Sequence, residues 1–476
     1  MSCIEFYSLL FFGKMKKHLI VLVVCLMGSS LYAQICFEKI ITLSITSTQS
    51  TGHAVIQTSD MGYAIAANDN TGGQHGLLIK TNAFGDTLWT KSHSGSFFDI
   101  KETPDGGFII TGAVNGSLLM VKTSPEGETQ WENYAGIDAI GFSICLTDDG
   151  GYCFAGVSDY SKYKVSKMFI VRTNAEGTIL WNQKYGEPDI WYLGRSMIQS
   201  GDGGFILCGS EQTTPFGAPS SLCLIKTKSG GTQEWKRSYH RSFTETGQVV
   251  LPSGDNGFLA VGNTVTSPFQ SFYLVRTDQL GDTLWTKTIE VRQTGSALSA
   301  TTVASGGYLL AVSVNDTVSN SNNIQLIRID NDGETIWTKQ VGSQNYEYVF
   351  SVKQTQDEGF ILCGSIWESG PQTMKIYLVK TDSLGYYPWV SVPEMEAETG
   401  LLVFPNPTSD IISVVVPENT LTIELCNMQG CLINKISVGN GHGRKHMLNL
   451  SGYSPGIYLV KVVTTENLFT RKILKL

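Results

Sequence analysis

The chain has 476 residues, a formal net charge of −8, 16% charged residues and 50 glycines. This acidic balance argues against nucleic acid or an anionic membrane surface as a partner, because both are themselves negatively charged. Abundant glycine with few charges is typical of an all-β protein with many tight turns, so we expect no long helices.

The N-terminus has the pattern of a secretory signal. Lys16 and Lys17 precede an apolar run from Leu19 to Met27, and the small residue Ala33 marks a cleavage point. The run is too short to span a bilayer comfortably. We therefore expect residues 1–33 to be a signal peptide, with Met15 as an alternative start, and no transmembrane segment after its removal.

A sevenfold repeat follows. In each copy a Lys or Arg precedes a Gly by five residues and a Trp by nine, and the tryptophans recur every 42 to 54 residues. A strand-rich unit of that length is typical of one four-stranded propeller blade. The sequence therefore predicts an all-β fold, a seven-bladed β-propeller over residues 34–392. Seven equal copies favour packing over catalysis, so we interpret the tryptophans as structural anchors: Trp89, Trp131, Trp181, Trp235, Trp285, Trp337 and Trp389.

Two registers fit the hairpin that carries each Trp. A type I turn with a glycine bulge places Trp89 opposite Ile79, whereas a four-residue loop places it opposite Lys80 as a cation–π pair. We favour the first, because the residue before the basic position is aliphatic in all seven copies.

The ends of the repeat array suggest how the ring closes. Residues 37–40 (FEKI) resemble the start of a Trp strand, while Pro388 weakens the seventh one because proline cannot donate to a ladder. We therefore predict that residues 37–43 supply the outer strand of the seventh blade. The small residue four positions after each turn glycine, such as Ala66 or Cys208, indicates crowding toward the propeller axis.

Beyond an acidic linker at residues 393–400, short alternating strands predict a small antiparallel β-sandwich over residues 401–476. Its motif residues resemble the type A C-terminal sorting domain of the Bacteroidota type IX secretion system: Pro405, Asn406, Pro407, Gly456, Tyr458, Lys472 and Lys475. The propeller resembles the secreted repeat proteins that carry such domains. The resemblance implies the type IX machinery as a partner and a secreted or outer-membrane surface location, with the propeller released or surface-attached.

The sequence contains no HExxH or GxxxxGK motif, and we assign no catalytic residue, metal or cofactor. The stretch 330–334 (DNDGE) resembles part of a calcium loop, but it occupies the same turn as the other copies. Two cysteine pairs are open to either interpretation, disulfide or free thiols: Cys145 with Cys153, and Cys426 with Cys431.

The connections after the second strand and after the Trp strand vary in length, and in a propeller both sets open on one face. We expect the ligand site there, although each residue could equally serve only to pack the loops; the binding candidates are Trp191, Tyr192, His240, Arg241, Tyr346, Tyr348 and Trp367. The predicted function is a binding or scaffold module for a glycan or peptide. The alternative is a carbohydrate-active enzyme, a glycoside hydrolase or lyase, with a pocket on the same face and two convergent carboxylates.

Overall fold

The structure is a computed structural model. It describes residues 35–43, 49–135, 138–159, 165–213, 219–242, 244–266, 269–316, 321–343, 345–368, 373–387, 401–404, 408, 410–417, 419–427, 432–438, 445–454, 456–465 and 468–475. The expected signal peptide and linker lie outside these residues. Backbone contacts divide the chain into two compact units, Met1–Pro388 and Trp389–Leu476.

The first unit consists of antiparallel groups of four strands, one group for each sequence repeat. The first four groups are separate sheets: β2 (Ser50–Gln57), β3 (Tyr63–Asp69), β4 (His75–Thr81) and β5 (Thr87–Ser94); β6 (Ser96–Glu102), β7 (Phe108–Val114), β8 (Ser117–Thr123) and β9 (Thr129–Ala135); β10 (Ala139–Leu146), β11 (Tyr152–Ser158), β12 (Lys167–Thr173) and β13 (Ile179–Tyr185); β14 (Trp191–Gln199), β15 (Phe205–Gln212), β16 (Ser220–Thr227) and β17 (Gln233–Tyr239).

The remaining groups are linked. They are formed by β18 (Glu245–Pro252), β19 (Phe258–Thr266), β20 (Phe269–Thr277), β21 (Thr283–Thr302), β22 (Tyr308–Asp316), β23 (Ser321–Ile329), β24 (Thr335–Val341), β25 (Tyr346–Gln354), β26 (Phe360–Glu368), β27 (Thr373–Thr381) and β1 (Phe37–Ile41). The long strand β21 pairs with β20 over its first half and with β22 over its second, so it serves two groups.

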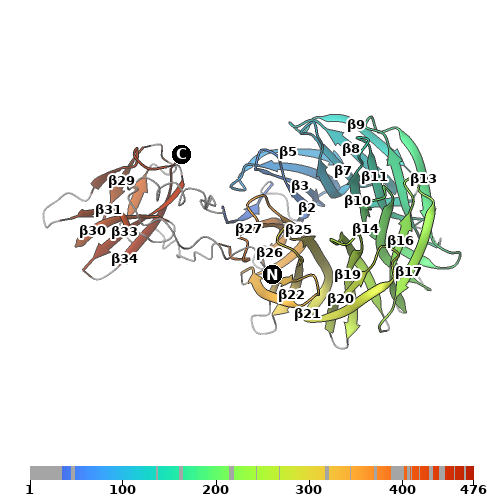
Figure 1. Cartoon of the computed structure of the whole chain (residues 1–476). Coiled ribbons are helices and arrows are strands. Elements are labelled where there is room, and N and C mark those ends of the chain that lie inside the picture. Colours follow the sequence, from blue (N-terminus) through green and yellow to red (C-terminus); the bar gives the residue numbers. More distant parts are fainter. Residues whose placement is uncertain are drawn as a thin grey trace, which may run out of the picture. The chain divides into compact units, whose positions relative to one another are not determined.

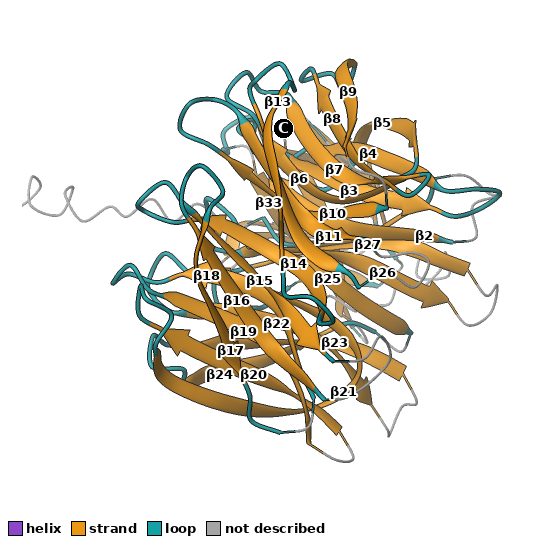
Figure 2. Cartoon of the chain, turned by 90° about the vertical axis from the view of Figure 1, so that its right-hand side faces the viewer, coloured by secondary structure: helices purple, strands orange, loops and turns teal. Residues whose placement is uncertain are grey.

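Each group is one blade of a β-propeller, in agreement with the prediction. The groups fan around a common centre, with β2, β10, β14 and β25 inside and β9, β13 and β17 at the periphery (Figure 1). The middle strands are buried along their length, as in β4, whereas the outer strand β5 alternates between exposed and half-buried residues. Strands covered on both faces carry continuous apolar runs, which explains the repeat composition. Figure 2 shows only strands and loops in the described residues.

The basic residue of the repeat is a buried cation that pairs within its own blade, which the sequence analysis missed. Its partner is the aspartate of the turn between the first and second strands: Lys80–Asp60 at 2.8 Å, Lys122–Asp105 at 2.8 Å, Lys226–Asp202 at 2.7 Å, Lys380–Asp357 at 3.0 Å, Arg172–Asp149 and Arg276–Asp255. Lys380 also donates to the backbone oxygen of Thr381 at 2.8 Å. In the sixth blade Ser305 replaces the aspartate, and Arg328 donates to Ser305 Oγ at 3.4 Å and to the Gly306 oxygen.

The favoured hairpin register is wrong. Trp89 lies opposite Lys80, and Ile79 pairs with Thr90, while Thr81 pairs with Thr87. The difference is one extra residue, Leu88, which forms a β-bulge between Thr87 and Trp89. Such a bulge shifts every later residue of the strand by one place.

The tryptophans join one blade to the next. Trp89 packs on Gly127 of the following hairpin so closely that a Cβ at that glycine would lie 2.6 Å from the ring. The same contact recurs in successive blades, from Trp131 on Gly177 to Trp337 on Gly385. These glycines have positive φ, so they are needed for the turn as well as for the contact. Trp389 lies outside the described residues.

The predicted ring closure is confirmed for Phe37–Ile41. Strand β1 pairs antiparallel with β27, with Phe37 opposite Lys380. Phe37 takes the place of a Trp: it lies against Gly85 of the first blade, where a Cβ would be 2.5 Å from its ring, and its ring centroid is 5.6 Å from that of Tyr63. Lys39 completes the match by pairing with Asp86 at 2.7 Å, as Lys91 pairs with Glu128 at 2.6 Å.

The second unit is the predicted small antiparallel sandwich. One sheet contains β28 (Leu402–Phe404), β29 (Ile411–Val415) and β32 (Lys445–Asn449), and the other contains β31 (Leu432–Ser437), β30 (Thr420–Asn427), β33 (Gly456–Thr464) and β34 (Leu468–Lys475). Apolar side chains from both sheets form its core, among them Ile412, Ile423, Leu448 and Val460.

Candidate ligand site at the propeller axis

The innermost strands share a β-bulge at one position of the repeat. Among the described residues, the register shifts at this position in six of the seven blades, and the bulged residues are His53, Phe98, Phe142, Arg195, Gln248 and Phe350. Each lies ten residues before the aromatic residue that follows the blade's first turn. A bulge redirects a side chain out of the ladder, and on an innermost strand the free direction is the propeller axis.

These residues meet although they come from different blades. The His53 ring lies 5.1 Å from Phe98 and 5.3 Å from Phe350, Phe98 lies 5.2 Å from Phe142, and the Arg195 guanidinium lies 4.7 Å from the Phe142 ring centroid. We call these five residues the axial arc: His53, Phe98, Phe142, Arg195 and Phe350. It combines ring faces, which stack on apolar or sugar surfaces, with a guanidinium that is stabilised over an aromatic ring.

The axial arc remains accessible to solvent. Its aromatic residues are half-buried and Arg195 is exposed, in contrast to the fully buried core aromatics such as Phe97. Burial lowers the pKa of His53 to about 4, so this imidazole is neutral near pH 7. Arg195 therefore gives the axial arc a positive charge.

A second layer of residues on the innermost strands lies three positions after the column of bulged residues, and two of its members, Cys145 and Leu251, are buried in core clusters between blades. Its members are Ile56, Lys101, Cys145, Ile198, Leu251, Thr301 and Lys353. Between the two layers Asp99 is the single carboxylate in the part of the chain that the structure describes. Its Oδ2 accepts the N–H of Ile144 at 2.8 Å and its Oδ1 accepts the N–H of Ile100 at 2.9 Å. The Lys101 ammonium lies 3.9 Å from Asp99.

Hydroxyl groups between these two layers tie the innermost strands to one another. Ser143 Oγ accepts the Met197 N–H at 3.1 Å, and Ser299 Oγ accepts the Val352 N–H at 3.1 Å, each from the next blade. Ser351 does the same for Val55 across the closure, at 3.3 Å. The axial arc is thus held on a rigid scaffold, which lowers the entropy cost of ligand binding.

Two of the predicted binding residues lie together. Tyr346 and Trp367 are cross-strand partners on β25 and β26 with ring centroids 6.0 Å apart, and Trp367 is 40% exposed. Tyr348 lies two residues along β25 and is half-buried. An exposed indole beside a tyrosine is suited to stacking.

Tyr192 does not fit the prediction of a ligand-facing ring. It is fully buried, the ammonium groups of Lys167 and Lys236 each lie 5.5 Å from its ring centroid, and its hydroxyl is 3.1 Å from Lys236 Nζ. Tyr192 thus packs the connection that enters β14. Its neighbour Trp191 is half-buried at the start of that strand.

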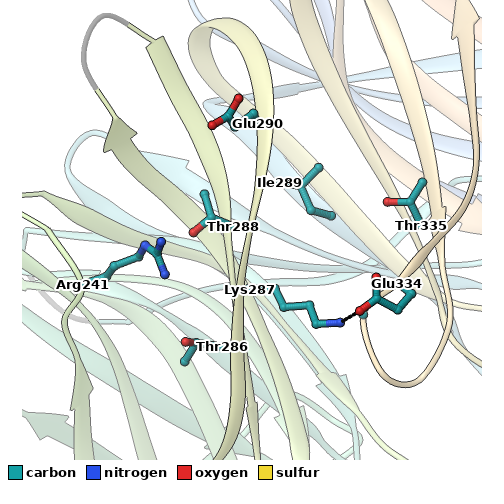
Figure 3. Close-up of a pocket in the computed structure, with 9 residues that line it drawn as sticks. Arg241, Thr286, Lys287, Thr288, Ile289, Glu290, Glu334 and Thr335 are labelled. Atoms are coloured by element: carbon teal, nitrogen blue, oxygen red, sulfur yellow. Dashed lines mark hydrogen bonds and ion pairs between the residues drawn. The ribbon is translucent and has the colours of Figure 1, made fainter.

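His240 and Arg241 lie in the connection between β17 and β18, both exposed. His240 Nδ1 is 3.2 Å from Oε2 of the buried Glu245, so Glu245 fixes the ring's position. Arg241 contributes to an open groove on the outer strand β21 (Figure 3). Figure 3 shows Lys287 pointing from β21 to Glu334, with which it forms an ion pair, while Arg241 lies on the other side of the strand. The groove is therefore a polar surface at the rim that does not join the other predicted residues.

The sequence contained a signal for the axial arc that the analysis did not use. Aligning the repeats on the turn aromatic places His53, Phe98, Phe142, Arg195 and Phe350 in one column. That column varies in residue type, whereas the columns on either side are small or apolar except at Asp99. A variable column within an otherwise repetitive strand indicates a surface that meets something other than the next blade.

Within the described ranges no three His, Cys, Asp or Glu residues cluster as metal ligands would. The turn at 330–334 is an ordinary hairpin turn in which Asp330 Oδ1 accepts the N–H groups of Asp332 and Glu334. Cys145 and Cys153 are cross-strand partners but are not bonded. Cys426 is a buried free thiol, and Cys431 lies outside the described residues.

Of the sorting motif, the structure describes four residues. Tyr458 donates its hydroxyl to the Ser454 oxygen at 2.7 Å, Lys475 pairs with Gly456, and Lys472 is exposed. The motif at 405–407 lies outside the described residues. The described residues include no helix that is long and apolar enough to cross a membrane.

Comparison with known families identifies residues 402–475 as a secretion system C-terminal sorting domain. None of the curated proteins matches the chain. The C-terminal unit is therefore an export module, and the predicted type IX sorting domain is confirmed.

Solved structures similar to the chain include other propellers. The β-propeller domain of the trilobed protease from Pyrococcus furiosus is 10% identical, with a TM-score of 0.44, and the match covers 74% of this chain and 98% of that one. A streptogramin B lyase is 12% identical, with a TM-score of 0.45 and coverage of 72% and 98%. Hydrazine synthase of Kuenenia stuttgartiensis is 11% identical, with a TM-score of 0.49 and coverage of 71% and 96%. Likenesses this distant give no information about ligands.

Proposed function

We propose that this protein is an exported propeller that binds a glycan or peptide outside the cell, with the axial arc as its principal contact surface. The observation that carries the proposal is the meeting of four rings and a guanidinium from five different blades at solvent-accessible positions. If this repeat position served only to pack the blades, its residue type would not need to vary, and its rings would not need to be half-buried where all blades converge.

The scarcity of carboxylates near the propeller axis favours binding over hydrolysis. Canonical glycoside hydrolysis needs two carboxyl groups flanking the scissile bond. Among the described residues that occupy the bulge positions of the innermost strands or directly follow them, Asp99 is the only carboxylate, and both of its oxygens accept backbone N–H groups. A carbohydrate-active enzyme remains the alternative, and product release from polysaccharides by the purified protein would favour it.

The sorting domain determines the setting of this function. It implies handling by the type IX secretion machinery and delivery to the cell surface or the medium. We propose that the sorting domain is removed at the outer membrane and that the propeller then acts as a secreted or surface-held binding module.

Glycan and peptide arrays probed with the full-length protein test the proposal. We expect Phe142→Ala and Arg195→Ala each to weaken binding roughly 10-fold, because each removes about 1–2 kcal/mol of stacking or cation–π interaction. The variants Trp191→Ala and Trp367→Ala test the loop residues in parallel. Leu88→Ala, which changes an apolar side chain that is 58% exposed beside a hairpin turn, is the control.

Two results would contradict the proposal. If the axial variants bind as well as the Leu88→Ala control while Trp367→Ala does not, the ligand site lies on the loops rather than at the axis. If the unaltered protein binds no glycan or peptide, the binding function itself is wrong.

A further inference from the structure

A row of aromatic residues runs along β25, the innermost strand of the seventh blade. Half-buried residues alternate with buried ones over the first part of this strand, and the first three half-buried positions are Tyr346, Tyr348 and Phe350. Successive residues of a strand point to opposite sides, so these three share one side. At about 3.3 Å per residue, the row extends about 13 Å along the strand.

The row faces the first blade and continues the axial arc. Val349, which lies between two of its members, points to the opposite side and packs in a core cluster that the seventh blade shares with the sixth. At the inner end of the row, the Phe350 ring lies 5.3 Å from that of His53, which belongs to the first blade. At the outer end, Tyr346 pairs with Trp367, which is 40% exposed and has its ring centroid 6.0 Å away.

The middle member of the row has no aromatic counterpart in the other blades whose bulge the structure describes. Tyr348 lies two residues before the bulged residue, and the corresponding residues of those blades are Thr51, Ser96, Ile140, Leu193 and Thr246. The blade fold therefore does not require a tyrosine at this position. We call Trp367, Tyr346, Tyr348 and Phe350 the aromatic track.

Polar groups of the first blade lie beside the outer end of the aromatic track. Met374 of β27 is the cross-strand partner of Trp367, and it forms a bridge with Gln49. Gln49 is exposed, and the half-buried Thr51 directs its hydroxyl to the Met374 sulfur at 3.4 Å. An exposed amide beside aromatic rings is suited to a sugar, because the face of a sugar ring is apolar and its edge carries hydroxyl groups.

The backbone of β25 is less suited to a peptide. An extended peptide binds by adding a strand to a free sheet edge, where it needs unpaired N–H groups. The Val349 N–H already donates to Ser313 Oγ at 3.0 Å, and the Val352 N–H donates to Ser299 Oγ at 3.1 Å. Both hydroxyls belong to the sixth blade, so contacts within the propeller occupy this edge.

We propose that the aromatic track binds a linear glycan lengthwise, so that the sugar chain covers Trp367, Tyr346 and Tyr348 and ends at the axial arc. This inference rests on the proposed function and narrows its ligand to an unbranched oligosaccharide of several units. A row about 13 Å long extends beyond one sugar ring, and a single line of rings matches an extended chain.

The dependence of affinity on chain length tests the aromatic track. Calorimetric titration of the full-length protein with the disaccharides and hexasaccharides of cellulose, xylan, chitin and laminarin measures it. In a series that binds, we expect the hexasaccharide to bind roughly 100-fold more tightly than the disaccharide, because it covers the outer rings as well as the axial arc. Trp367→Ala and Tyr346→Ala should each weaken hexasaccharide binding roughly 10-fold and leave disaccharide binding unchanged.

A matched variant controls for the loss of an exposed ring. Tyr134 lies on the outer strand β9 of the second blade and is 55% exposed. Tyr134→Ala should bind both saccharides as the unaltered protein does. A second readout needs no weakened variant: in protein labelled with 5-fluorotryptophan, the ¹⁹F resonance of Trp367, assigned with Trp367→Phe, should shift with the hexasaccharide and not with the disaccharide.

Three results would overturn the aromatic track: a gain in affinity no larger than the number of disaccharide units in the hexasaccharide, an equal loss for both saccharides in Trp367→Ala, or no binding in any of the four series. Peptide binding that Phe142→Ala weakens would then keep the proposed function. Hexasaccharide binding that Trp367→Ala weakens and Phe142→Ala does not would keep the aromatic track and remove the axial arc as the principal contact surface.

Discussion

Replacing Asp357 with Asn should destabilise the propeller more than replacing its partner Lys380 with Met. Lys380 has a side chain that is 1% exposed, whereas the Asp357 side chain is 19% exposed. Asp357→Asn leaves a buried ammonium with two neutral acceptors, the Thr381 oxygen and the Asn amide oxygen. Breaking a buried pair in this way costs about 3 kcal/mol, the lower end of the usual range, because these two acceptors remain.

Lys380→Met has a smaller cost. The Asp357 carboxylate would keep its hydrogen bonds from Thr355 Oγ1 at 2.5 Å and from the Gly359 N–H at 3.2 Å, and it reaches solvent. We expect a loss of about 1 kcal/mol, and the double variant should recover most of the stability lost by Asp357→Asn, because no charge is then left unpaired.

Thermal unfolding of the full-length protein, followed by circular dichroism at pH 7, measures these differences. At about 2 °C per kcal/mol for a domain of this size, Asp357→Asn should lower the midpoint by roughly 6 °C and Lys380→Met by roughly 2 °C. The reasoning fails if the two single variants have equal midpoints, or if the double variant is less stable than Asp357→Asn.

Three further predictions concern the same framework. Ser305→Asp supplies the carboxylate that Arg328 lacks and should raise the free energy of unfolding by about 0.5–1 kcal/mol in urea titrations; a gain of equal size from Ser305→Asn would show that charge is not the cause. Phe37→Ala should open the ring closure, because Phe37 is 7% exposed, so hydrogen exchange should quicken in β1 and β27 but not in β15, whereas Ile40→Ala, at a position that is 42% exposed, should change little. Partial burial opposes ionisation of Asp105, but hydrogen bonds from Lys122, Thr103 and the Gly107 N–H outweigh it and lower the pKa from 3.8 to about 2. The stability that this pair contributes is therefore complete above about pH 5 and is lost as the pH falls from about 4 to 2. Asp105→Asn should reduce the slope of the free energy of unfolding against pH in that window. An unchanged slope would contradict the assignment.

The repeat in the sequence was sufficient to predict the propeller and its closure. The interval between tryptophans is a property of the chain alone, and a strand-rich unit of that length has few ways to bury its apolar residues other than stacking blades. The match between residues 37–40 and a Trp strand worked for the same reason: Phe37 repeats the contact that each Trp makes with the next hairpin glycine.

The register of the hairpin could not be decided in this way. Whether Trp89 faces Ile79 or Lys80 depends on a single extra residue at Leu88, and both alternatives satisfy the same local pattern of side chains. The buried pair Lys80–Asp60 favours the observed one, but its members are 20 residues apart and become neighbours only when the blade forms.

The sequence alone thus determined the number of repeats, the strands and the export domain, because each of these follows from the spacing of residues that are close together in the chain. Only the tertiary structure decided which side chains share a surface. It brought Phe98, Phe142 and Phe350 to one axis and buried Tyr192, because these contacts join different blades and depend on how the ring closes.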